Sequence, residues 1–211
     1  MASPGGEHAG SAYSAGTSRG LAEAKTALRS ELLAARRLLT PQQRTDAGHL
    51  LRDAVLALPE AEMTGTAAAY YSVATEPDTH GLIFALWKRG TYVLLPVLRP
   101  DGDLDWASYE GPDSLAPGPR GLLEPTEPPR GVTAITSADL IIVPALAVGR
   151  DGVRLGRGGG SYDRALARVG PAVLTLALLY DGELVDRVPS GPHDVAVRAA
   201  VLPAEGISRL G

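Results

Sequence analysis

A glycine-rich segment between a predicted strand and a predicted helix constrains this chain more than any other feature. The segment Arg154–Arg164 reads RLGRGGGSYDR and holds four glycines within five positions. It follows the apolar run ADLIIVPALAV, typical of a buried strand, and it leads into YDRALARVG, typical of a helix. Glycine lets a ligand approach the backbone closely, and the amides at a helix N-terminus favour an anion. The segment therefore predicts an α/β unit with a phosphate site in its turn.

The composition places the chain among globular proteins. Its 211 residues are 45% hydrophobic and carry a net charge of −4, which suits one sizeable domain. The acidic balance argues against a broad nucleic-acid surface, and no apolar run reaches the roughly 18 residues of a membrane helix. Because cysteine is absent, the chain has no disulfide, thiolate nucleophile or zinc–thiolate site, which agrees with a cytoplasmic location.

The sequence predicts a disordered N-terminal segment followed by a folded domain. Residues 1–20 are rich in Gly, Ser and Ala without periodicity, and they predict a disordered tail. This segment has neither the basic start nor the apolar core of a signal peptide. The remainder, residues 21–211, predicts a single catalytic α/β domain.

The first predicted helix, Leu21–Leu39, presents two faces. Its apolar residues recur at helical spacing and predict a stripe that faces the core: Leu28, Leu32, Ala35 and Leu39. Lys25, Arg29 and Arg36 share another face, which is either a solvated basic surface or a surface that meets a polyanion.

A second helix is predicted from Thr40 to about Leu58. Thr40 suits the N-cap, Pro41 the first turn, and Gln43 completes a capping box. The side chains expected to face the core are Leu50, Leu51, Val55 and Leu58.

Strands alternate with helices along the rest of the chain. Strands are predicted at 66–73, 91–98, 140–143, 172–179 and 197–202, with a helix from Asp78 or Thr79 to Gly90 and another after the glycine segment. This alternation is typical of an α/β fold whose central, mainly parallel sheet is flanked by helices on both faces. Ligands of such sheets bind beyond the carboxyl ends of the strands, which allows Glu76 and the glycine segment to face one crevice.

The glycine segment matches neither common nucleotide-binding fingerprint. The GxxxxGK[ST] spacing is absent, and Ser161 occupies the third glycine position of the dinucleotide motif. By pattern alone the segment is either a plain turn before a helix or a phosphate site. The forked donors of Arg154 and Arg157, together with the carboxylate of Asp163, favour phosphate accompanied by magnesium. Asp163 is alternatively a helix-start carboxylate.

Two further carboxylates are candidates for a site. Glu76 lies in a strand-to-helix loop, where it either accepts hydrogen bonds from a heterocycle or is an exposed turn residue. Asp194 follows His193 in a late loop and is a candidate second magnesium ligand.

Residues 139–164, DLIIVPALAVGRDGVRLGRGGGSYDR, resemble the signature of the 5-formyltetrahydrofolate cyclo-ligase (5,10-methenyltetrahydrofolate synthetase) family. The similarity extends to the early helix, to YYSVATEPDT, to the strand that ends in LLP, to GLLEP and to the late HD pair. It implies a single-domain α/β enzyme of one-carbon metabolism that acts on small molecules, and we expect this enzyme to be a monomer. With ATP and magnesium, such an enzyme closes the 5-formyl group of tetrahydrofolate onto N10 and releases ADP and phosphate.

The resemblance also implies roles for individual residues. Those implied to contact ATP are Lys25, Arg29, Arg154, Leu155, Gly156, Arg157, Gly158, Gly159, Gly160, Ser161 and Tyr162, of which Lys25, Arg154 and Arg157 supply the catalytic charges. Those implied to contact the folate are Tyr71, Glu76, Arg157, Gly158, Gly159, Gly160 and Ser161. Asp163 and Asp194 match the magnesium carboxylates.

Two positions depart from the family pattern. Ser161 stands where many relatives have an aromatic residue, and Arg198 stands where an HDxxxD pattern would place a second aspartate. These departures leave open a non-catalytic relative that binds folate or nucleotide. A sugar-phosphate isomerase on a similar α/β scaffold is the other alternative, in which the glycine segment would bind the phosphate of the substrate.

Overall fold

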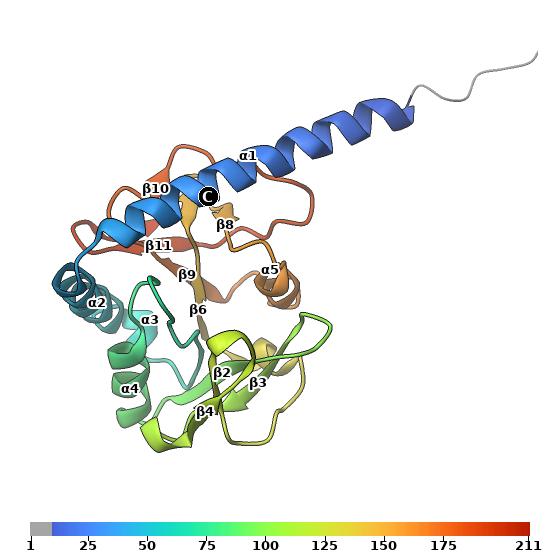
Figure 1. Cartoon of the computed structure of the whole chain (residues 1–211). Coiled ribbons are helices and arrows are strands. Elements are labelled where there is room, and N and C mark those ends of the chain that lie inside the picture. The colour runs from blue at the N-terminus through green and yellow to red at the C-terminus, as the bar shows by residue number, and fades with distance from the viewer. Residues whose placement is uncertain (1–9) are drawn as a thin grey trace, which may run out of the picture.

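A twisted sheet forms the centre of the molecule (Figure 1). The structure is a computed structural model that describes residues 10–211, with side chains described from residue 19 onward. Within this range, seven strands form the main sheet in the order β12-β11-β9-β6-β1-β2-β3. Their bounds are β1 Thr66–Ala68, β2 Tyr92–Leu98, β3 Leu104–Ser108, β6 Leu140–Pro144, β9 Leu174–Leu178, β11 Ala199–Leu202 and β12 Gly206–Arg209.

The interior of the sheet is parallel and its two edges are antiparallel. Strands β11, β9, β6, β1 and β2 pair in parallel, whereas β3 and β12 pair antiparallel with their neighbours. The predicted mainly parallel α/β sheet is therefore confirmed. Strand β12 was not predicted, and β1 ends at Ala68 instead of continuing to Val73 because hydrogen bonds to side chains hold the next residues in a loop.

Helices cover both faces of this sheet, as predicted. Helices α2 (Pro41–Leu56), α3 (Pro59–Glu62) and α4 (His80–Lys88) lie on one face, while η3 (Ala134–Ser137) and α5 (Ser161–Leu166) lie on the other. Because side chains of a strand alternate between the faces, Ile142 of β6 packs with the cluster that holds Leu51 and Ile83. Its neighbour Ile141 packs with the cluster that holds Ile135 and Leu166.

Helix α2 begins with the predicted capping box. The Gln43 amide donates to the Thr40 hydroxyl at 3.2 Å, and the Thr40 amide donates to Gln43 Oε1 at 2.8 Å. Leu51 and Val55 face the core as predicted. Leu50 is 52% exposed, so its predicted core position is wrong. Consecutive residues of a helix point in different directions, and here Leu51 faces the core while Leu50 faces solvent.

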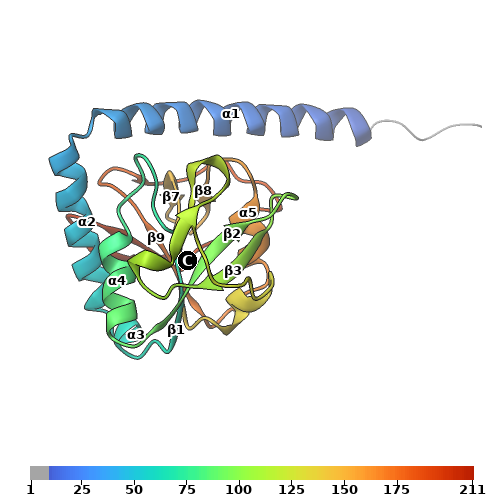
Figure 2. The same cartoon turned by 60° about the horizontal axis from the view of Figure 1, so that its bottom comes forward.

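Helix α1 is longer than predicted and lies across one end of the domain (Figure 2). It spans Gly10–Leu38, and its N-terminal part extends beyond the body of the molecule. Residues 10–20 are therefore helical where the sequence predicted a disordered tail, and residues 1–9 lie outside the described residues. Once the docked part of a helix exists, each added residue gains a hydrogen bond without a new nucleation cost.

The face by which α1 docks differs from the predicted stripe. Leu28 and Leu32 pack, half-buried, against a cluster that includes Leu155, but Ala35 is exposed. Arg36, assigned by pattern to a basic surface, is only 2% exposed. Its guanidinium donates at 2.7 Å to each oxygen of Glu183 and at 2.7 Å to the Ala145 carbonyl.

Two small sheets lie beside the main one. Strands β7 (Ala147–Gly149), β8 (Arg154–Leu155) and β10 (Leu184–Val185) form one of them, in the order β10-β7-β8. Strands β4 (Leu115–Pro117) and β5 (Leu123–Pro125) form a hairpin, tied to the end of β2 where the Leu98 amide donates to Glu124 at 2.8 Å. Among the described helices, none is both long and apolar enough to cross a membrane.

Glu183→Ala is expected to lower the free energy of unfolding by about 3–5 kcal/mol, because it leaves the buried guanidinium of Arg36 without its partner. Urea denaturation followed by circular dichroism measures the change. Asp186→Ala is the matched control, since Asp186 is a fully exposed partner of Arg150 and its loss should leave the midpoint unchanged. Equal midpoints for the two variants would contradict the role given to the buried pair.

Candidate active site

A cleft of about 860 Å³ opens beyond the carboxyl ends of β2 and β6. The end residues of these strands, Leu98 and Pro144, line it. Helix α1 contributes Lys25, Arg29 and Arg36, and the whole of Arg154–Arg164 lies along the wall. Glu76 lines the same cleft, so the two segments that the sequence placed at strand ends do face one crevice.

The glycine segment forms the turn between β8 and α5. Gly158 and Gly160 have φ angles of 101° and 68°, a region that side chains other than glycine rarely adopt. The Gly156 carbonyl accepts a hydrogen bond from Arg29 Nε at 2.9 Å, which ties the turn to α1. Helix α5 is only six residues long, so its dipole is weaker than the sequence pattern suggested. Attraction for an anion would therefore depend chiefly on the surrounding cations.

Arg154 is a buried cation at the base of the cleft. It is 4% exposed, its Nη2 donates to Asp163 Oδ1 at 2.9 Å, and its guanidinium lies 5.7 Å from the centre of the Tyr162 ring. Burial lowers the pKa of Arg154, and the neighbouring charges of Asp163 and Asp194 only partly oppose this. Its Nε has no hydrogen-bond partner among the described residues.

Lys25 and Asp194 form the closest ion pair of the cleft. The ammonium of Lys25 donates to the two carboxylate oxygens at 2.5 and 2.8 Å, and the Gly191 amide donates to Oδ2 at 2.7 Å. Burial acts to raise the pKa of Asp194, but these hydrogen bonds and the charges of Lys25 and Arg154 lower it overall. Both oxygens of Asp194 are thus already engaged.

Asp163 differs from Asp194 in having an oxygen to spare. Its Oδ1 accepts from Arg154 and, at 3.3 Å, from the Val195 amide, while Oδ2 has no hydrogen-bond partner within the described part of the chain. Residues 10–211 contain no group of three or more His, Cys, Asp or Glu side chains that could hold a metal ion. Oδ2 of Asp163 is therefore available to a metal whose remaining ligands come from water and a phosphate, whereas each oxygen of Asp194 already accepts a hydrogen bond.

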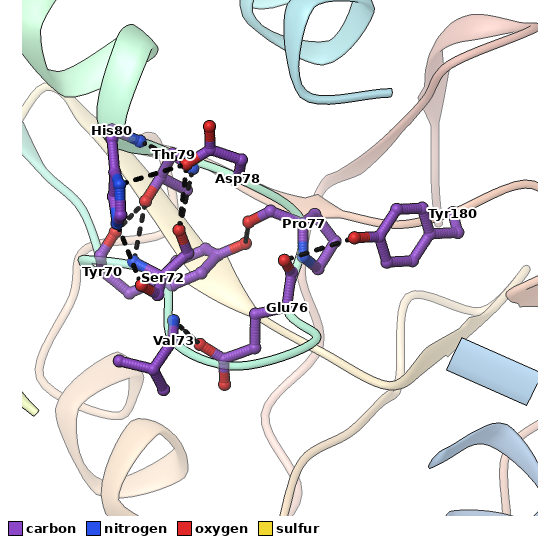
Figure 3. A network of polar contacts seen from close by, with 9 residues as sticks. All are labelled: Tyr70, Ser72, Val73, Glu76, Pro77, Asp78, Thr79, His80 and Tyr180. Atoms are coloured by element: carbon purple, nitrogen blue, oxygen red, sulfur yellow. Dashed lines mark hydrogen bonds and ion pairs between the residues drawn. The ribbon is translucent and has the colours of Figure 1, made fainter. Parts of the chain in front are cut away.

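The loop that carries Glu76 is held by its own side chains (Figure 3). The Thr79 hydroxyl donates to the Tyr70 carbonyl at 2.7 Å and accepts from the Ser72 amide at 3.0 Å. Glu76 Oε2 accepts from the Val73 amide at 3.0 Å, which folds the carboxylate back over the turn. Its backbone carbonyl accepts from the hydroxyl of Tyr180 at 3.3 Å.

Glu76 also reaches across the cleft to the glycine segment. Its Oε1 accepts a hydrogen bond from Arg157 Nε at 3.1 Å. The Glu76 side chain is 10% exposed and that of Arg157 is 50% exposed, so the pair closes one side of the cleft with the arginine outermost. The contact joins residues 81 positions apart in the sequence.

Two of the residues singled out from the sequence, Tyr71 and Arg198, do not line the cleft, and Ser161 lines it with its hydroxyl engaged elsewhere. Tyr71 stacks on His80, with ring centres 3.9 Å apart, and is not among the described residues that line the cleft. The Ser161 hydroxyl donates to the Gly102 carbonyl at 2.5 Å, which binds the β2–β3 turn to α5. Arg198 is exposed just before β11, also away from the cleft lining.

Sequence reasoning missed part of the lining. The missed residues include Arg36, Leu98, Leu104, Arg120 and Leu122. The signal for Arg36 was its shared helix face with Lys25 and Arg29. No pattern in the sequence linked the β4–β5 hairpin to the glycine segment, because their proximity depends on the packing of β5 against β2.

Comparison with known proteins identifies relatives along nearly the whole domain. Residues 21–203 match the sequence model of the 5-formyltetrahydrofolate cyclo-ligase family. A 5-formyltetrahydrofolate cyclo-ligase of Mycolicibacterium smegmatis is 39% identical over 192 residues, covering 88% of this chain and 97% of that protein. The enzyme of the same name from Escherichia coli is 33% identical over 173 residues, covering 81% and 95%.

A solved structure resembles the fold. The 5,10-methenyltetrahydrofolate synthetase of Aquifex aeolicus superposes with a TM-score of 0.77 at 27% identity, covering 88% of this chain and 92% of that one.

Arg29→Ala is expected to weaken the binding of inorganic tripolyphosphate about tenfold, because the substitution removes one positively charged hydrogen-bond donor from the cleft lining. Titration calorimetry at fixed ionic strength measures the affinity. Arg37→Ala removes an exposed arginine from the same helix and should bind tripolyphosphate like the wild type. Identical affinities for all three proteins would contradict a role for Arg29 in binding a polyanion.

Proposed function

The chain belongs to the 5-formyltetrahydrofolate cyclo-ligase family and is an enzyme of that class, and we propose that it converts 5-formyltetrahydrofolate to 5,10-methenyltetrahydrofolate with ATP and magnesium. ADP and phosphate are the other products. The single observation that carries the ATP dependence is the cleft itself, where Lys25, Arg29 and Arg154 converge on one glycine-rich turn. The family match argues against the sugar-phosphate isomerase.

The chemistry needs an activated formyl oxygen and a correctly placed amine. The formyl oxygen attacks the γ-phosphorus of ATP, the bond from phosphorus to the ADP oxygen breaks, and an iminium phosphate forms at N5. The N10 lone pair then bonds to the formyl carbon, and phosphate leaves with the former formyl oxygen. N10 loses its proton, so the methenyl product retains one positive charge. No step needs a nucleophilic side chain, which suits a chain without cysteine.

Positioning and neutralisation of charge are what the cleft would supply to this reaction. Lys25, Arg29 and Arg154 are placed to neutralise phosphate oxygens, and the amides of the glycine turn can approach them closely. Arg154 is the most buried of these three cations, so water screens its charge least, and its Nη2 is paired with Asp163.

Magnesium would be held by Asp163 together with phosphate oxygens. The free Oδ2 of Asp163 supports this assignment. When bound, the ion would neutralise charge that develops on the transferred phosphate. Asp194 is better suited to fixing the ammonium of Lys25, since each of its oxygens already accepts from that group.

Glu76 would recognise the pterin. Its carboxylate can accept hydrogen bonds from the ring N–H and amino groups of that heterocycle. Arg157 Nε and the Val73 amide each donate a hydrogen bond to one of its oxygens. Arg157, at 50% exposure, is the partner with room to turn toward a bound phosphate. A cytoplasmic, monomeric enzyme stays the expectation from the sequence.

The direct test is absorbance of the methenyl chromophore after the protein is mixed with 5-formyltetrahydrofolate, ATP and magnesium. We expect the chromophore with the complete mixture, and its absence when ATP or magnesium is omitted. Formation without ATP would contradict the phosphoryl-transfer route. Binding of both ligands without any chromophore would instead favour a non-catalytic relative.

The two aspartates are expected to respond differently to magnesium. Asp163→Asn should lower activity by tenfold or more and raise the magnesium concentration needed for half-maximal rate, because a metal carboxylate is lost. Asp194→Asn should raise the KM for ATP without a matching magnesium effect, because Lys25 loses its partner. Initial rates over a grid of magnesium and ATP concentrations separate the effects, and equal magnesium responses would overturn the distinction.

A further inference from the structure

The cleft contains more cations than its carboxylates neutralise. Four of its cations form ion pairs: Arg36 with Glu183, Lys25 with Asp194, Arg154 with Asp163, and Arg157 with Glu76. Among the residues that the structure describes, the other three lining cations have no carboxylate partner: Arg29, Arg120 and Arg164. This surplus indicates that the cleft takes up more than one anionic group.

The three surplus cations are not equivalent. Arg29 donates to the Gly156 carbonyl, on the phosphate side of the cleft. Arg164 donates to the Gly102 carbonyl at 2.6 Å and is thereby fixed to the β2–β3 turn. The side chain of Arg120 makes no hydrogen bond within residues 19–211, and the residue is exposed at the cleft wall. Its guanidinium is therefore the one that a ligand can engage without breaking an existing contact.

The backbone of the β4–β5 hairpin holds Arg120 in an unusual conformation. Its φ and ψ angles are 58° and 24°, the left-handed region that an L-residue other than glycine, asparagine or aspartate seldom occupies. The turn is closed by hydrogen bonds from the Gly118 amide to the Leu122 carbonyl, at 2.8 Å, and from the Leu122 amide to the Pro119 carbonyl, at 3.1 Å. A strained residue with a free charged side chain in a cleft wall is typical of a ligand contact.

An apolar surface lies beside this arginine. Leu122 of the hairpin, Leu98 at the end of β2 and Leu104 at the start of β3 all line the cleft. The bond from the Leu98 amide to Glu124 fixes the hairpin to β2 and so keeps these leucines together. The wall thus offers a hydrophobic patch next to one unpaired guanidinium.

The chemical groups of the proposed substrate follow the same order as the hydrophobic patch and the guanidinium on this wall. A folate consists of a pterin, an aminobenzoyl ring and a glutamate with two carboxylates. We propose that Arg120 binds the glutamate carboxylates of 5-formyltetrahydrofolate, while the aminobenzoyl ring packs on Leu98 and Leu122. This inference rests on the proposed function. It gives Arg120 a role in substrate specificity and none in the phosphoryl transfer.

Calorimetric titration without ATP tests the proposal by binding alone. The ligands are 5-formyltetrahydrofolate and its diamide, in which both glutamate carboxylates are neutral amides. The wild type should bind the diacid at least tenfold more tightly than the diamide. Arg120→Gly and Arg120→Asn should bind the diacid about as weakly as the diamide, and Arg120→Lys should fall between them. Gly and Asn tolerate the left-handed backbone, so these variants should unfold at no lower temperature than the wild type.

Arg37→Ala is the matched control, and it should retain the preference for the diacid. Equal preference in the wild type and in Arg120→Gly would overturn the role of Arg120 and leave the proposed function intact. A variant with weakened ATP binding and unchanged folate binding would move Arg120 to the phosphate side and also overturn it. If the wild type binds neither folate, the proposed function fails and this inference fails with it.

Discussion

The position of helix α1 depends on one buried ion pair. Arg36 and Glu183 lie in the interior, where desolvation of two charges is costly unless every donor and acceptor is satisfied. Here the fork of Arg36 meets both Glu183 oxygens and the Ala145 carbonyl, and Glu183 also accepts from the Tyr180 amide at 2.8 Å. Lys25 lies 11 residues before Arg36, about 16 Å along the helix axis. Fixing Arg36 therefore fixes where α1 delivers Lys25 to the cleft.

The same pair connects the two ends of the cleft. Tyr180, whose amide binds Glu183, extends its hydroxyl to the backbone of Glu76. The helix that presents the phosphate-side cations and the loop that presents the carboxylate thus share one buried anchor. Four of the lining cations form ion pairs with carboxylates, and three more have no such partner among the described residues, so the cleft keeps a local excess of positive charge. A bound polyanion would add its charge to this excess of cations.

Ser161 gains a structural explanation from its contact with Gly102. Its hydroxyl, with Arg164, fixes the β2–β3 turn against the start of α5, and that turn borders the leucine-lined wall. The residue that departs from the family pattern therefore joins the two walls of the cleft by a hydrogen bond. Arg198, the other departure, lies outside the cleft and bears on neither wall.

Sequence alone determined the features that depend on near neighbours in the chain. The capping box at Thr40, the alternation of strands and helices, and the glycine turn at Gly158 follow from local hydrogen bonds, periodicity and allowed φ angles. Only the tertiary structure decided which charges pair: Lys25 meets Asp194 from 169 positions away, and Arg36 enters the core. Burial and partner choice depend on distance in space, which a periodic pattern does not contain, and the same holds for the free guanidinium of Arg120.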